Sequence, residues 1–235
     1  MNKKQNYLVI DTETKGIDNP LVYDIGGAIV DRYGNVYHTF SFVIKEMWHD
    51  HWELLKTAYF ADKLPNYLKD LLEEKRELVT YRQAKEYIAK LCEEYKVKAI
   101  IAHNAIFDYN ATRHTQKFLT DGKYSTFLPY GIEIWDTMKM AQDVIATKKS
   151  YIKFCEENGY MTKHATPRVQ VKAEVLYRYI SGNNDFIESH TGLEDVLIEK
   201  EIFARCVKEK KAMRRALFND WLELFWISLR VQILL

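Results

Sequence analysis

A four-residue apolar run near the start of the chain, Tyr7-Leu8-Val9-Ile10, is followed at once by Asp11 and Glu13. The run is typical of a buried strand. Residues i and i+2 of a strand point to the same face, so we expect the two carboxylates to lie side by side. Two like charges that close repel unless a positive group lies between them. The end of the strand therefore predicts either a polar turn, which Gly16 would favour, or a site for cations.

The elements that follow predict an α/β fold. Two more β-like runs, 24–31 and 37–45, are joined by a turn-rich link and predict an antiparallel meander with the first strand. Residues 48–78 have a helical composition that is interrupted by Pro65. The pair Thr80 and Gln83 predicts a capping box that opens a helix through residue 95.

The second half alternates strands with helices. We expect a strand at 97–102, a helix at 105–119, a strand at 131–135 and a helix through 146. This alternation predicts a parallel section of the sheet, because parallel neighbours need a crossover connection. Two short helices are expected at 151–158 and 172–181. Thr191 and Glu194 predict a second capping box, at the start of a last helix that runs to about residue 211.

Composition restricts the cellular context more than the function. The 34 Lys and Arg residues balance 33 Asp and Glu residues, so any nucleic-acid contact must come from a local patch. The three isolated cysteines, Cys92, Cys155 and Cys206, predict buried thiols in a reducing compartment. The N-terminal apolar run is too short for a signal peptide, and nothing before residue 216 approaches a membrane span. We therefore expect a cytoplasmic protein without a membrane partner.

Two further carboxylates are placed to approach the first pair. Asp108 lies one helical turn beyond the 97–102 strand, and ligands in α/β sheets favour such strand ends. Asp195 lies in the first turns of the last helix, with His190 just before it. Four carboxylates at one place need a countercharge, which hard divalent cations supply. Two such ions suit displacement at phosphorus, and an imidazole suits proton transfer near neutral pH. These residues predict a two-metal phosphodiesterase site.

The same residues carry a family resemblance. Three short motifs resemble the three exonuclease motifs of the DEDDh 3′–5′ exonucleases, the family of the proofreading epsilon subunit of bacterial DNA polymerase III. In chain order they are Asp11-x-Glu13, Asn104-x-x-x-Asp108 and His190-x-x-x-x-Asp195. The resemblance covers roughly residues 5–210 and extends to stand-alone, phage-encoded members. It implies an RNase H-like fold with a five-stranded mixed sheet, in which the first three strands are antiparallel and the rest parallel.

The resemblance also implies a role for each motif residue and a cofactor. Two Mg²⁺ or Mn²⁺ ions are expected, with Asp11 shared between them and Asp108 binding directly or through water. The implied metal ligands are Asp11, Glu13, Asp108 and Asp195. His190 is the implied general base, and the implied substrate contacts are Thr12, Thr14 and Asn104.

Three neighbouring residues are expected to serve the fold. Asp136 is expected to cap a helix, and Phe107 to lie in the core. His103 is expected to have a structural role beside Asn104.

The predicted function is therefore a metal-dependent 3′–5′ exonuclease that releases nucleoside monophosphates from single-stranded 3′ ends, with DNA preferred. RNA or oligoribonucleotide trimming is the alternative enzyme, because the same site serves it and only contacts to the 2′-hydroxyl separate the two substrates. A non-catalytic nucleic-acid-binding adaptor is the alternative from another class, and the intact set of five site residues argues against it. The chain holds no polymerase domain, so proofreading would need a partner.

The end of the chain falls outside the resemblance. We expect an exonuclease domain at 1–211 and an apolar helical tail at 212–235. Apolar residues at helical spacing predict a docking surface for the domain itself, for a second subunit or for a replication partner. The residues of this stripe are Leu217, Trp221, Leu222, Phe225 and Leu229.

Overall fold

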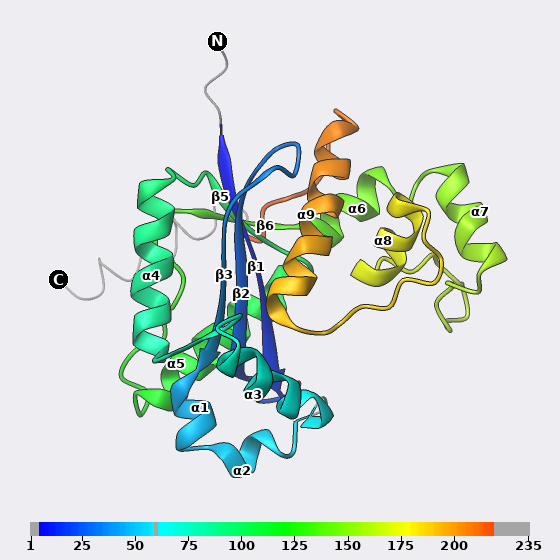
Figure 1. Ribbon diagram of the computed structural model, residues 1–235. Coiled ribbons are helices and arrows are strands. Elements are labelled where there is room, and N and C mark those ends of the chain that lie inside the picture. Colours follow the sequence, from blue (N-terminus) through cyan, green and yellow to red (C-terminus); the bar gives the residue numbers. More distant parts are fainter. Residues whose placement is uncertain (1–4, 59–60, 219–235) are drawn as a thin grey trace, which may run out of the picture.

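A computed structural model describes residues 5–58 and 61–218, and within them six strands form one mixed sheet (Figure 1). The strand order is β4-β3-β2-β1-β5-β6. Neighbours are antiparallel from β1 to β3 and parallel at β1–β5, β5–β6 and β3–β4. The strands are β1 (Asn6–Lys15), β2 (Leu21–Asp31), β3 (Val36–Ile44), β4 (Glu77–Val79), β5 (Ala99–Ala102) and β6 (Glu133–Asp136). The predicted mixed sheet is confirmed, with one strand more than expected.

The extra strand, β4, lies inside the stretch that the sequence presented as helical, so the prediction for 48–78 is wrong in part. That stretch contains α1 (Lys45–His49), α2 (Trp52–Leu55), a 3-10 turn η1 (Ala61–Lys63) and α3 (Leu64–Leu72) before β4. Pro65 lies in the first turn of α3, where a missing N–H costs nothing. Three residues are too few to show strand alternation, so β4 left no local signal.

Helices cover both faces of the sheet (Figure 1). One face carries α4 (Tyr81–Glu94) and α5 (Ala105–Leu119), and α4 begins with the predicted capping box at Thr80. The other face carries α6 (Thr137–Val144), α8 (Ala173–Ser181) and α9 (Gly192–Lys208), with α7 (Lys149–Glu157) beyond them. Asp136 caps α6 as predicted, since its side chain accepts the Met138 N–H.

The second predicted capping box does not form. Thr191 is the N-cap residue of α9, but its hydroxyl donates to the Glu194 carboxylate at 2.6 Å and not to the helix backbone. Asp24, on β2, accepts the Gly192 N–H at 2.9 Å instead. A carboxylate 168 positions away in the sequence thus satisfies the start of α9, and no local motif could have shown that.

The alternation along β1 divides its side chains between two cores. Leu8 and Ile10 belong to the core shared with α4, whereas Tyr7 and Val9 belong to the core shared with α9. Because side chains alternate along a strand, the Tyr7–Val9 series continues to Asp11 and Glu13 on the α9 side. Thr12 points to the opposite side.

Past α9 the chain returns to the sheet. The Asp136 N–H donates to the Arg215 carbonyl at 2.8 Å, and the Leu217 N–H donates to the Ile134 carbonyl at 2.7 Å. The first residues of the expected 212–235 tail thus pair with the edge of β6. The rest of its apolar stripe, from Trp221 onward, lies outside the described residues.

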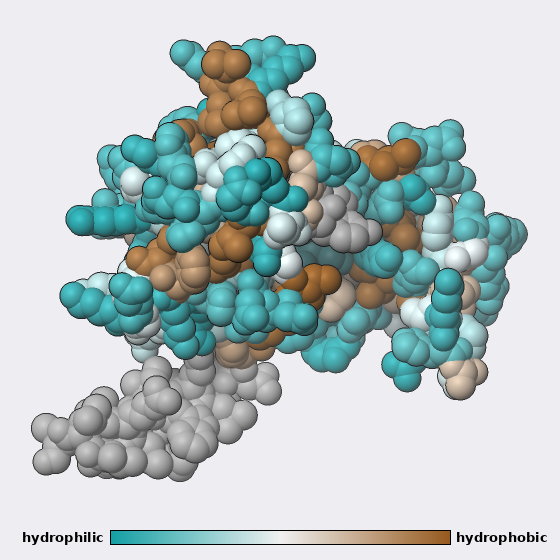
Figure 2. Space-filling view, turned by 90° about the horizontal axis from the view of Figure 1, so that it is seen from below, coloured by the Kyte–Doolittle hydropathy of each residue, from teal (hydrophilic) through white to brown (hydrophobic). Residues whose placement is uncertain are grey.

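No helix in the described ranges is long and apolar enough to cross a membrane. On the face viewed from the side of α1–α3, apolar surface occurs as separate areas between hydrophilic ones (Figure 2).

Candidate active site

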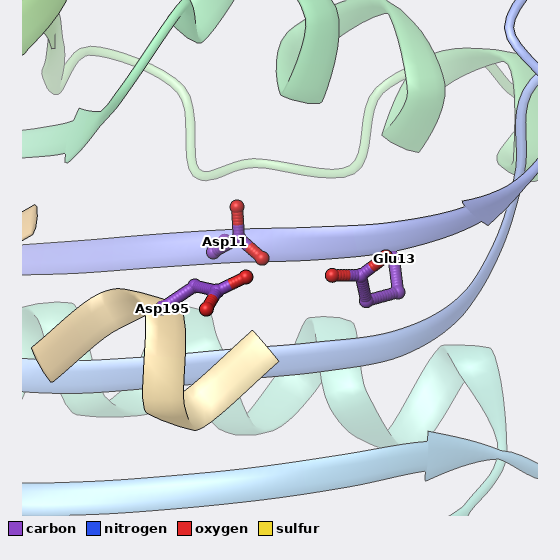
Figure 3. Close-up of side chains that lie close together, drawn as sticks. All are labelled: Asp11, Glu13 and Asp195. Carbon is purple, nitrogen blue, oxygen red and sulfur yellow. The ribbon is translucent and has the colours of Figure 1, made fainter. Parts of the chain in front are cut away.

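Three carboxylates from β1 and α9 converge at the end of the sheet. Asp11 and Glu13 point from β1 toward Asp195, which approaches from α9 (Figure 3). One oxygen atom from each residue lies within 4.8 Å of those of the other two. Carboxylate oxygens grouped in this way are the ligands that hard divalent cations prefer.

Two glycines allow α9 to reach β1. Asp11 pairs with Gly26 in the β1–β2 register, and Gly26 lies directly against Gly192 at the start of α9. A Cβ atom on Gly26 would lie 2.0 Å from the Gly192 carbonyl carbon, and one on Gly192 would lie 2.5 Å from the Gly26 nitrogen. The two backbones are therefore in direct contact, and this contact places Asp195, one helical turn after Gly192, beside Asp11.

Burial dominates the electrostatics of the three carboxylates. Burial, strengthened by neighbouring carboxylates, raises the pKa of Glu13 to about 8 and that of Asp195 to about 8. Burial and the charge of Glu199 raise the pKa of Asp11 well above its usual range. Oδ2 of Asp11 is buried and has no hydrogen-bond partner among the described residues. A cation would supply both the missing partner and the missing countercharge, so the residues present fit a divalent metal ion.

Asp108 reaches the same strand end from the other face. It lies on α5, and its Oδ1 accepts the Thr12 N–H at 3.1 Å and the Thr12 hydroxyl at 2.8 Å. Burial raises the pKa of Asp108 to about 7, although the hydrogen bonds from Thr12 act to lower it. Asp108 is not part of the three-carboxylate group, although its charge acts on Asp11 and Glu13. The buried Thr12 side chain thus contacts Asp108, the carboxylate of the second motif.

His190 lies on the segment just before α9. Its backbone has a positive φ of 52°, and its Nδ1 lies 3.8 Å from Oε2 of Glu188. Burial and the charge of Lys63 lower the His190 pKa below 6.5. Lys63 also donates to the Ser189 carbonyl, next to this histidine. The lowered pKa favours the neutral imidazole, which is the form that can accept a proton.

The remaining predicted residues lie near the end of β1 and in the turn between β5 and α5. Asn104 has a left-handed backbone at the start of α5, and its N–H donates to Asp136 at 3.1 Å. The Thr14 hydroxyl donates to the Gly16 carbonyl at 3.0 Å. The ring of His103 is held between the Thr137 hydroxyl and the Val171 carbonyl, at 2.9 and 2.7 Å. The structural role expected of His103 agrees with these contacts.

Sequence reasoning missed Glu199. This residue is 3% exposed, its Oε2 has no partner among the described residues, and its charge acts on Asp11 more than that of any other neighbour. Its own pKa is raised well above the usual range by burial and by Asp108 and Asp195. The signal was present, since Asp195 and Glu199 are four residues apart and share one face of α9.

No family model matches the chain. A curated DNA polymerase III of the PolC type from Mycoplasmopsis pulmonis is 32% identical over 117 residues, which is 49% of this chain and 7% of the polymerase. The chain thus spans a small part of that relative.

Solved structures of exonuclease I share the fold. A product-bound form has a TM-score of 0.51 at 15% identity, over 88% of this chain and 44% of that protein. A zinc-bound E. coli complex of exonuclease I with single-stranded DNA has a TM-score of 0.50 at 15% identity, over 89% of this chain and 41% of the other. The comparisons confirm the predicted mixed α/β fold, which this chain shares with exonuclease I, and they agree with the resemblance of its motifs to those of DEDD-type 3′–5′ exonucleases.

Proposed function

We propose that the protein is a metal-dependent 3′–5′ exonuclease that releases nucleoside monophosphates from single-stranded DNA 3′ ends. The convergence of Asp11, Glu13 and Asp195 within 4.8 Å, with a buried Asp11 oxygen left without a partner among the described residues, carries the proposal. The likeness to exonuclease I supports it, since one of those structures is a complex with single-stranded DNA.

Each site residue has a proposed task. Asp11, Glu13 and Asp195, together with Asp108, would hold two divalent metal ions. When bound, such ions stabilise the charge on the attacking and leaving oxygens of a phosphodiester. His190 accepts the proton of the attacking water. Asn104 and Thr14 line the approach of the terminal nucleotide, whereas the predicted substrate contact Thr12 is buried and holds the Asp108 carboxylate instead.

The proposed exonuclease domain spans residues 1–211. Trimming of RNA is the second enzymatic candidate, because the same carboxylates serve either substrate and the choice rests on contacts to the 2′-hydroxyl. A binding protein without turnover is a weaker candidate, since binding alone gives no reason to bury several carboxylates at one strand end.

The test uses 5′-labelled single-stranded DNA and RNA of one sequence, incubated with Mg²⁺, Mn²⁺ or a chelator. We expect a ladder that shortens stepwise from the 3′ end, only with metal, and faster on DNA. Asp11→Ala should abolish it, whereas Asp18→Ala, in the β1–β2 turn, should leave it intact. Tight binding without shortening would refute the enzyme, and a faster ladder on RNA would reverse the substrate preference.

A further inference from the structure

A buried arginine outside the carboxylate group holds the start of α9. Arg76 lies between α3 and β4, and its side chain is 4% exposed. Its guanidinium donates to four side chains that come from α3, β2, β3 and α9. These are Asp70 at 3.0 Å, Asp24 at 3.3 Å, Ser41 at 2.9 Å and Glu194 at 3.0 Å.

Two of these four partners lead to the first turn of α9. Asp24 is fully buried, and its Oδ2 also accepts the Tyr67 hydroxyl at 2.7 Å and the Gly192 N–H at 2.9 Å. Glu194 lies two residues further along the helix and also accepts the Thr191 hydroxyl. The backbone of this helical turn is thus bound to β2 directly through Asp24, and its Glu194 side chain is bound to β2 through the Arg76 guanidinium.

The position of this turn decides whether the three carboxylates meet. Asp195 follows Glu194 directly, and His190 precedes Gly192 by two residues. The glycine contact between Gly26 and Gly192 permits α9 to approach β2, but it has no side chain to fix the angle or register of the helix. Polar contacts around Arg76 supply that restraint.

We propose that Arg76 is a positioning residue of the site: by binding Asp24 and Glu194 together, it fixes the first turn of α9 on β2 so that Asp195 meets Asp11 and Glu13. This inference rests on the proposed function. A planar guanidinium can bind two carboxylates at fixed angles, which a lysine ammonium cannot do. The matching of Arg76 to its partners is therefore specific to arginine.

The test compares three variants with one control in the full chain. Arg76→Met removes all the hydrogen bonds, and Arg76→Lys keeps the charge but not the planar guanidinium. Glu194→Gln removes only the negative charge of the partly exposed partner. Arg82→Met is the control, because Arg82 forms an exposed pair with Glu86 on α4 at 2.7 Å. Mn²⁺ binding without substrate, hydrogen exchange of the amides at 190–196, and kcat and KM on single-stranded DNA are measured for each.

Arg76→Met should weaken Mn²⁺ binding and lower kcat by about 10–100-fold, with KM changed by less than about threefold. Exchange at 190–196 should speed up by a similar factor, while α4 stays protected. Arg76→Lys should restore part of both losses, and Glu194→Gln should show about a two- to fivefold effect. Arg82→Met should behave as the unsubstituted protein.

Wild-type Mn²⁺ affinity and wild-type exchange at 190–196 in folded Arg76→Lys and Glu194→Gln would overturn the proposal. These two variants decide the matter if Arg76→Met does not fold. Exchange and metal binding need no turnover, so they report on Arg76 even if the unsubstituted protein cuts neither DNA nor RNA. In that case the proposed function would fail separately.

Discussion

Replacing Gly26 by alanine tests whether the contact between β2 and α9 assembles the site. The new Cβ would lie 2.0 Å from the Gly192 carbonyl carbon, whereas ordinary contact begins near 3.4 Å, so the backbone must move by about 1.4 Å. The atoms in the way belong to the backbone of Gly192 and Leu193, which cannot turn aside as a side chain can. The first turn of α9 must therefore move away from β2, and Asp195 moves with it.

A displacement of this size is large for a site of this kind. A 1 Å misplacement of catalytic groups can cost about 10²-fold in rate, so Gly26→Ala should lower kcat by at least that factor and weaken Mn²⁺ binding. Overpacking should also cost about 1–3 kcal/mol of unfolding free energy, or roughly 2–4 °C in Tm for each kcal/mol. Single-turnover hydrolysis of 5′-labelled DNA, measured well below the Tm, gives the rate.

Gly27→Ala is the matched control. Its Cβ would lie 2.1 Å from the ring of Phe40, on the opposite face of the same strand. The cost in stability should be similar, but the strain falls on a side chain in the α4 core and α9 stays in place. Equal loss of rate in both variants, or a folded Gly26→Ala with the wild-type rate, would refute the reasoning.

Three further predictions concern the charges of the site. His190→Ala should slow hydrolysis about 10²–10⁴-fold at pH 7 while the loop histidine variant His164→Ala does not, and equal rates would remove His190 from the chemistry. Glu199→Gln removes a buried carboxyl group whose ionisation is unfavourable in the folded chain, so the Tm in EDTA at pH 8 should rise and the Mn²⁺ affinity should fall about tenfold. No change in either quantity would exclude Glu199 from the site. Burial raises the pKa of Glu13 from 4.5 to about 8, so the folded chain binds this proton more tightly than the unfolded chain. That contribution is fully present below pH 4.5 and is lost as the pH rises through 8, so the Tm in EDTA should fall between pH 6 and 9, and saturating Mg²⁺ should reduce the slope. A flat profile in EDTA would contradict the burial of Glu13.

Much of the fold could be predicted because its signals are local. The helix at 105–119 was predicted with the bounds that the structure gives it, since it follows a continuous apolar strand. The Thr80 capping box needed only four consecutive residues. By contrast, β4 has three residues, of which Glu77 and Leu78 are exposed, so its sequence carries no pattern, and its pairing with β3 depends on the tertiary fold.

The site shows the same division between local and distant signals. The pairing of Asp11 with Glu13 on one face follows from strand geometry alone, and the structure brings both to Asp195. The support around them joins positions that are distant in sequence, such as Asp24 and Gly192, and no spacing predicts it. Glu199 was within reach of helix periodicity, but a glutamate among apolar residues of a helix usually lies on the solvated face.

The arrangement around β1 explains why the site needs both cores. Alternation sends Asp11 and Glu13 toward α9 and Thr12 toward α5, so Asp195 and Asp108 approach one strand end from opposite faces of the sheet. Neither helix can move without changing the distance between its carboxylate and the strand. Burying like charges is unfavourable by itself, so packing in the two cores must hold them together until a cation binds. Metal binding should therefore stabilise the whole domain, and the contacts that fix α9 and α5 should matter as much for turnover as the carboxylates themselves.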